Sequence, residues 1–174
     1  MLALAGFDRK TNAPLMNEDP LEIVLSEVGC AGLNRIIKDN PKTQALELIC
    51  GSGDFDHSPL QQLENLRKLI IHGDFEILPD FGELPQVEEL HLFECCDLLD
   101  ISNIVRFPNV TTLEISDVLN LECDKWKPIS KLTNLRHLNL DRNSTFNHAD
   151  DFKTLVNLET FSAVDCPDLA CVYG

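Results

Sequence analysis

The sequence predicts a single α/β domain in which one short unit, a strand followed by a return segment, repeats along the chain as a solenoid. Three observations lead to this fold class. Six segments share one apolar pattern at near-regular spacing, their strand-like stretches alternate apolar and polar residues, and the two ends differ from the middle. The 174 residues are 44% hydrophobic and 25% charged, which fits one structural domain with a sizeable core.

Residues 1–40 are predicted to form an N-terminal capping segment that is largely helical. Asp19-Pro20 followed by Glu22 has the order typical of a helix start, and apolar residues then recur at helical spacing. Two glycines interrupt this pattern, and Asn40-Pro41 ends it, so we expect a kinked helix or two short helices. Such a segment would cover the apolar edge of the first repeat.

Residues 41–174 contain six copies of one pattern, and the atypical last copy is expected to act as the C-terminal cap. The central apolar residues of the copies are Leu46, Leu69, Leu90, Leu113, Leu138 and Phe161. Successive centres are 23, 21, 23, 25 and 23 residues apart. Because a single unit of this size cannot bury its apolar face alone, the regular period indicates stacked units.

The clearest copy contains Leu132, Leu135, Leu138, Leu140 and Asn143, and it resembles the leucine-rich-repeat family in its L-x-x-L-x-L-x-x-N/C pattern. The resemblance extends over about residues 40 to 166. It implies a right-handed solenoid with a curved parallel β-sheet on the concave face and short 3-10 or one-turn helices on the convex face. It also implies that the protein recognises protein surfaces.

The Asn or Cys position of the family implies a buried side chain that bonds to backbone groups of the turn after each strand. In this chain the position holds Gly51, Asp74, Cys95, Val118, Asn143 and Cys166. Cys95 and Cys166 are therefore expected to be structural. The total of seven cysteines is odd and no C-x-x-C pair occurs, which indicates reduced thiols and a cytoplasmic protein.

The formal net charge of −15 indicates which partners suit this protein. Acidic residues outnumber Lys and Arg by 29 to 14, which disfavours nucleic acid and anionic membranes and favours a protein partner with a basic surface. The first ten residues lack the order of a signal peptide, and no apolar run approaches the ~18 residues of a membrane span. We therefore expect a cytoplasmic monomer with no contact to membranes.

The side chains of the open, concave face can be assigned to columns, because the parallel strands are expected to pair in register about 4.8 Å apart. We expect the partner to bind at Glu47, Ile49, Ile70, His72, Glu89, His91, Phe93, Glu114, His137 and Asp141. Large apolar side chains on a solvent-facing surface are not explained by the core. Ile49, Ile70 and Phe93, ringed by carboxylates, therefore predict a partner with an apolar centre and a basic rim.

Other interpretations remain open for several of these residues. His91 and Glu114 are neighbours in one column, so a metal-binding or hydrolytic site is the alternative to protein binding. A transition-metal site needs three or four converging ligands, whereas diagonal positions on a sheet lie ~7 to 8 Å apart. Trp126 either fills the convex-side core, which we favour, or is an exposed anchor.

The predicted function is therefore a non-enzymatic protein-binding module without a cofactor or a metal, such as an inhibitor or an immunity-type protein. A recognition fragment of a larger receptor or effector, and an open face with no ligand, are the further alternatives. The sequence identifies the surface that recognises a partner but does not identify the partner.

Overall fold

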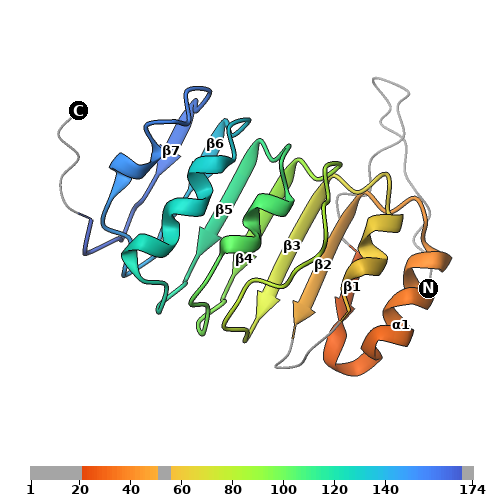
Figure 1. The fold of residues 1–174 in the computed structure, drawn as a ribbon. Coiled ribbons are helices and arrows are strands. Elements are labelled where there is room, and N and C mark those ends of the chain that lie inside the picture. Colours follow the sequence, from red (N-terminus) through yellow and green to blue (C-terminus); the bar gives the residue numbers. More distant parts are fainter. Residues whose placement is uncertain (1–20, 51–55, 170–174) are drawn as a thin grey trace, which may run out of the picture.

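The computed structural model describes residues 21–50 and 56–169, and for residues 24–30 it describes the backbone alone. The fold is α/β, with one open sheet of seven parallel strands in the order β1-β2-β3-β4-β5-β6-β7. Each strand pairs with the strand that follows it in the sequence. The helices of the described residues lie along one side of the sheet, and none of them covers the other side (Figure 1). The predicted α/β class with a parallel sheet is confirmed.

The strands are short and come at the positions of the repeated pattern. They are β1 (Leu21–Val24), β2 (Ala45–Cys50), β3 (Lys68–Gly73), β4 (Glu89–Phe93), β5 (Thr112–Ser116), β6 (His137–Asn139) and β7 (Thr160–Ser162). Alternate residues of a strand point to opposite faces, so the leucines two apart share the core side. Leu90 and Leu92 of β4 are fully buried opposite Leu113 and Ile115 of β5, as predicted.

The connections contain short helices because a unit of this length has little room left once its strand is subtracted. The helices are α1 (Leu25–Asp39) and the 3-10 helices η1 (Ser58–Gln62), η2 (Ser102–Arg106), η3 (Cys123–Lys131) and η4 (Ala149–Phe152). Trp126 of η3 is 1% exposed, and its ring meets the Phe146 ring edge-on at 5.5 Å. Its predicted place in the core is thus confirmed, and it is not an exposed anchor. None of the helices in the described ranges is long and apolar enough to cross a membrane.

The N-terminal segment differs from the prediction of a helix that includes Leu21 and Glu22. Residues Leu21–Val24 form strand β1, in which Leu21 lies opposite Leu46 of β2. Helix α1 then runs without a break from Leu25 to Asp39. The expected start at Asp19-Pro20 lies outside the described residues. A strand is favoured because the edge of β2 offers backbone donors and acceptors that a local helix would leave unpaired.

The chain leaves the strands through residues with a left-handed backbone. Glu94, Asp117, Arg142 and Asp165 have φ values between 56° and 60°. Gly73 holds the equivalent place in an earlier copy with a φ of 141°, and a Cβ atom there would lie 1.8 Å from the Cys50 carbonyl oxygen. Glycine is required at this point for both reasons.

In each of these turns the Asn or Cys position directly follows the residue with the left-handed backbone. In the turn after β6 this position holds Asn143, which is fully buried. Its side chain donates to the carbonyl oxygens of Ile115 and Leu140, at 2.7 and 2.8 Å, and accepts the Val118 N–H at 3.0 Å. The buried thiol of Cys95 lies 3.4 Å from the Phe93 carbonyl oxygen. These contacts support the expected structural role of the position.

The remaining members of this column vary. Cys166 is half-buried and donates to the Leu140 carbonyl oxygen at 3.0 Å, Asp74 is exposed, and Gly51 lies outside the described residues. The free thiols among the described cysteines are Cys50, Cys95, Cys96, Cys123 and Cys166.

The last copy is more open than its neighbours. Phe161 occupies the leucine position of β7 and contacts the rings of Phe146 and Phe152 at centroid distances of 6.2 and 6.3 Å. Its side chain is nevertheless 40% exposed, unlike the buried leucines at the same position of the earlier copies. The reason is its place at the end of the sheet order, where β6 alone pairs with β7 in the described part of the chain.

Candidate functional site

The candidate site is the side of the sheet opposite the helices of the described residues, which we call the open face (Figure 1). The strand pairing aligns its side chains in columns from β2 to β7, as predicted. The first column is Ala45, Lys68, Glu89, Thr112, His137 and Thr160, and the second is Glu47, Ile70, His91, Glu114, Asn139 and Ser162. The third column, Ile49, His72, Phe93 and Ser116, is in register from β2 to β5.

Two pairs of histidine and glutamate connect neighbouring strands of the open face. His72 Nε2 lies 2.8 Å from Glu47 Oε1, and His91 Nδ1 lies 3.1 Å from Glu114 Oε2. The second nitrogen of His91 lies 3.8 Å from Glu89 Oε2. The contact of His91 Nδ1 with Glu114 is a hydrogen bond, whereas the contacts of His72 with Glu47 and of His91 with Glu89 are ion pairs when the imidazole is protonated.

The apolar part of the predicted site lies beside these pairs. The Phe93 ring has centroid distances of 5.7 Å to His72 and 5.6 Å to His91, with both pairs of rings tilted. Ile49, Ile70 and Phe93 are half-buried. His91 itself is only 9% exposed, which is less than we expected for a residue of the open face. His91 occupies its predicted position in the second column, but the side chains of Phe93, Glu89 and Glu114 shield it from solvent.

His137 and Asp141 belong to the C-terminal part of the predicted site. His137 is exposed, and its Nδ1 lies 2.9 Å from the Thr160 hydroxyl. Asp141 Oδ1 accepts the Ser162 hydroxyl at 2.6 Å and the Val164 N–H at 2.7 Å. The Asp141 carboxylate therefore also holds the chain at the end of β7, a role that sequence reasoning did not identify.

The metal-binding alternative can be compared with this geometry. In residues 21–50 and 56–169, no group of three or more His, Cys, Asp or Glu side chains is placed to hold a metal ion. The contact of His91 with Glu114 allows an imidazole and a carboxylate to share a proton. Hydrolytic chemistry at this pair stays a hypothesis.

A narrow groove crosses β5, β6 and β7 on the open face and has a volume of about 240 Å³. One wall is formed by Thr112, His137 and Thr160 of the first column, and the other by Glu114, Asn139 and Ser162 of the second. Sequence reasoning missed this groove. Its signal is the presence of Ser, Thr or Asn at four of the six column positions in the last three copies.

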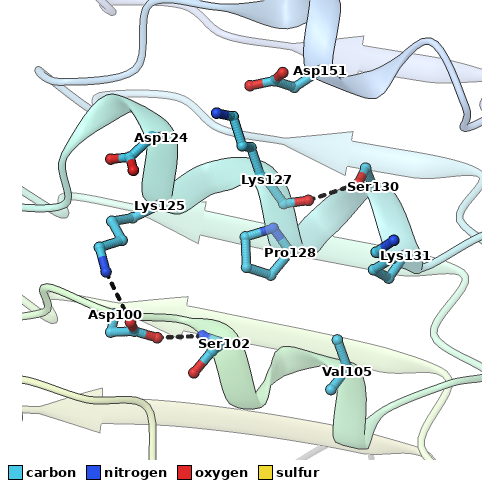
Figure 2. A pocket seen from close by; sticks show the side chains of 10 residues that line it. All are labelled: Asp100, Ser102, Val105, Asp124, Lys125, Lys127, Pro128, Ser130, Lys131 and Asp151. Atoms are coloured by element: carbon cyan, nitrogen blue, oxygen red, sulfur yellow. Dashed lines mark hydrogen bonds and ion pairs between the residues drawn. The ribbon is translucent and has the colours of Figure 1, made fainter.

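A wider hollow of about 630 Å³ lies on the helical side, among η2, η3 and η4 (Figure 2). Three lysines and three aspartates contribute to its lining. Lys125 Nζ lies 3.2 Å from Asp100 Oδ2, and the Ser130 hydroxyl donates to the Lys127 carbonyl oxygen at 2.7 Å. Because the charges balance, this hollow favours neither a cationic nor an anionic ligand.

A row of asparagine side chains comes from the segments that directly precede β5, β6 and β7 in the chain. Asn109, Asn134 and Asn157 each donate to a backbone carbonyl oxygen one repeat earlier, at 2.8, 3.1 and 2.9 Å. Each of these asparagines stands four residues before a strand centre, and this spacing is the signal that we missed. The row joins consecutive repeats and is structural.

Comparison with known proteins does not change this picture. Neither a scan against models of protein families nor a search of curated proteins found a match for this chain. The functional assignment is therefore based on the geometry of the open face.

Proposed function

We propose that this chain is a leucine-rich-repeat solenoid that acts as a non-enzymatic protein-binding module and binds a protein with a basic surface on its open face. The observation that carries the proposal is the alignment of open-face side chains in two unbroken columns over the six strands β2 to β7. The period of 21 to 25 residues, the parallel pairing of consecutive strands and the short connecting helices support the repeat assignment.

The chemistry of the open face supports the kind of partner. Phe93 and two isoleucines supply an apolar centre, and Glu47, Glu89 and Glu114 supply negative charge around it. Interfaces often combine a buried aromatic anchor with a polar rim. The net charge of −15 would also steer a basic protein toward this chain over a long range. An inhibitor or an immunity-type protein directed against a basic protein would use such a surface.

The proposal is tested by capture from a lysate of the source organism, with mass spectrometry and matched variants. Phe93→Ala and Glu114→Lys change the open face, while Val105→Ala and Glu122→Lys make similar changes at exposed positions in and next to the helices of the other side. We expect the first two variants to lose the captured protein and the two controls to retain it. Melting curves confirm that all four variants are folded.

Binding kinetics with the captured protein then separate the contribution of the apolar contact at Phe93 from that of the negative charge at Glu114. Phe93→Ala should shorten the residence time about 30-fold, which corresponds to a hot spot of ~2 kcal/mol. Glu114→Lys should slow association, and this effect should shrink as the salt concentration rises. Capture that survives both open-face variants but is lost in a helical-side variant would reject the open face as the binding surface.

A further inference from the structure

We infer that the groove over β5, β6 and β7 is the subsite for a single arginine side chain of the partner, with Glu114 as the carboxylate that receives the guanidinium group. This inference rests on the proposed function, because it specifies which group of a basic protein the open face binds and where it binds. It is based on the shape of the groove, its charge and its hydrogen-bonding groups.

The shape of the groove suits one extended side chain. Its walls are two columns of the open face, and the backbone of the middle residues Leu113, Leu138 and Phe161 lies between them. Three strands about 4.8 Å apart give the groove a length of about 10 Å. A volume of about 240 Å³ is small for a helix or a folded segment but adequate for a side chain.

Short side chains keep this space open. Over β5 to β7 the two columns hold Thr112, Thr160, Asn139 and Ser162 together with the larger His137 and Glu114. At the equivalent positions of β3 and β4 the columns hold Lys68, Glu89, Ile70 and His91, with no Ser, Thr or Asn among them. The groove is therefore a consequence of residue size in the last three copies.

The charge of the groove selects a cation. Glu114 is the carboxylate among the described lining residues, which include His137 but neither lysine nor arginine. Its side chain is 31% exposed and is held from two sides, by His91 Nδ1 at 3.1 Å and by Asn139 Nδ2 at 3.2 Å. A carboxylate oxygen accepts more than one hydrogen bond, so Glu114 can take a further donor without losing these contacts. The fixed position lowers the entropic cost of binding.

The hydrogen-bonding groups favour guanidinium over ammonium. The Ser162 hydroxyl donates its proton to Asp141, so its lone pairs are available to a ligand donor. The hydroxyl oxygens of Thr112 and Thr160 add acceptors on the opposite wall. A guanidinium group has five donors in one plane and can bond to the carboxylate and to such acceptors together, whereas an ammonium group acts as a compact charge.

A nuclear magnetic resonance titration tests this inference without the partner. The probe is N-acetyl-arginine methylamide, and the matched control ligand is N-acetyl-citrulline methylamide, which has a similar shape and no charge. We expect saturable shifts of backbone amides in β5, β6 and β7 with the arginine probe, weaker binding of the lysine analogue, and no saturable shift with citrulline.

Three variants locate the binding. Glu114→Gln should weaken the arginine probe about tenfold or more, because a hydrogen bond to a charged group is lost. Glu47→Gln removes the same charge from another strand of the open face and should bind like the parent. Thr160→Trp keeps Glu114 but fills the groove from the exposed edge strand, and it should abolish binding.

Several results would overturn the inference. These are equal binding of citrulline or lysine, shifts confined to other strands, and an arginine affinity that Glu114→Gln and Thr160→Trp leave unchanged. The captured protein separates this failure from failure of the proposed function. Capture that is lost in Phe93→Ala but kept in Glu114→Gln and Thr160→Trp rejects the arginine subsite alone, whereas capture unaffected by all three variants rejects the open face.

Discussion

Asn143 shows how one buried polar side chain stabilises a turn of this protein. It bonds to three backbone groups, so Asn143→Ala would remove its hydrogen bonds from the Ile115 carbonyl oxygen, the Val118 N–H and the Leu140 carbonyl oxygen, of which the last keeps the Cys166 thiol as a donor. We expect the free energy of unfolding to fall by about 3 kcal/mol or more. Urea denaturation measures this change.

Asn120→Ala is the control for this prediction. It removes one hydrogen bond from an exposed amide to the Cys96 carbonyl oxygen, at 2.8 Å, and should change the free energy of unfolding by about 0.5 kcal/mol or less. Equal losses in the two variants would show that the bonds of Asn143 do not stabilise the turn.

The cysteines differ in reactivity because they differ in burial. Burial raises the pKa of the Cys50 and Cys95 thiols to about 12, so almost no thiolate forms there at pH near 8. Cys123 is exposed. We expect a short treatment of the native protein with iodoacetamide to label Cys123 and to leave Cys50 and Cys95 unmodified until urea is added. Peptide mapping by mass spectrometry reads out each site, and native labelling of Cys95 at the rate of Cys123 would contradict this prediction.

At the scale of elements, the turns after β5 and β6 are joined by a charged pair. Arg142 donates from Nε to Asp117 Oδ1 at 3.0 Å and from Nη2 to Asp117 Oδ2 at 2.8 Å. The hydrogen bond from Arg142 lowers the pKa of Asp117, and the positive charge of Arg142 adds to this effect. Because the pKa is lower in the folded state than in the unfolded state, the pair stabilises the fold above the unfolded pKa of about 3.9 and loses this effect as pH falls.

Asp117→Asn should therefore lower the free energy of unfolding at pH 7, and the difference from the parent should disappear as the pH falls through the lowered pKa of Asp117. The loss at pH 7 should be about 0.5 kcal/mol, since both side chains are roughly half exposed to solvent. Asparagine tolerates the φ of 60° at this position, so backbone strain does not add to the effect. Urea denaturation at several pH values measures it.

Asp165→Asn is the matched control for the charged pair. Asp165 has the same left-handed backbone, with a φ of 58°, and the substitution removes the same charge. A pH-dependent loss of equal size in Asp165→Asn would mean that the contact with Arg142 does not cause the effect.

At the scale of the whole molecule, the net charge of −15 opposes compaction. Salt screens this repulsion, since the Debye length falls to about 8 to 10 Å near physiological ionic strength. We expect the melting temperature to rise between about 20 and about 200 mM sodium chloride. Exposed ion pairs weaken over the same range, but each contributes little. A melting temperature that falls with salt would show that the ion pairs outweigh the net repulsion.

The sequence alone determined the strands β2 to β7, their parallel register and the side of the sheet on which each leucine lies. The reason is the repeat. When each unit has a neighbour with the same pattern, aligning the copies also aligns the strands, and the alternation in Leu90-His91-Leu92 assigns each side chain to a face. The same alignment placed His91 beside Glu114 before any distance was known.

Only the tertiary structure decided the state of Leu21–Val24, the shielding of His91 and the groove beside Glu114. The segment Leu21-Glu22-Ile23 fits a helical pattern, yet it also repeats Leu46-Glu47-Leu48 at a distance of 25 residues, and the edge of β2 selects the strand. Exposure and groove shape depend on the size of side chains from several strands at once. Local periodicity contains no information on these contacts, because they arise only when the strands lie side by side.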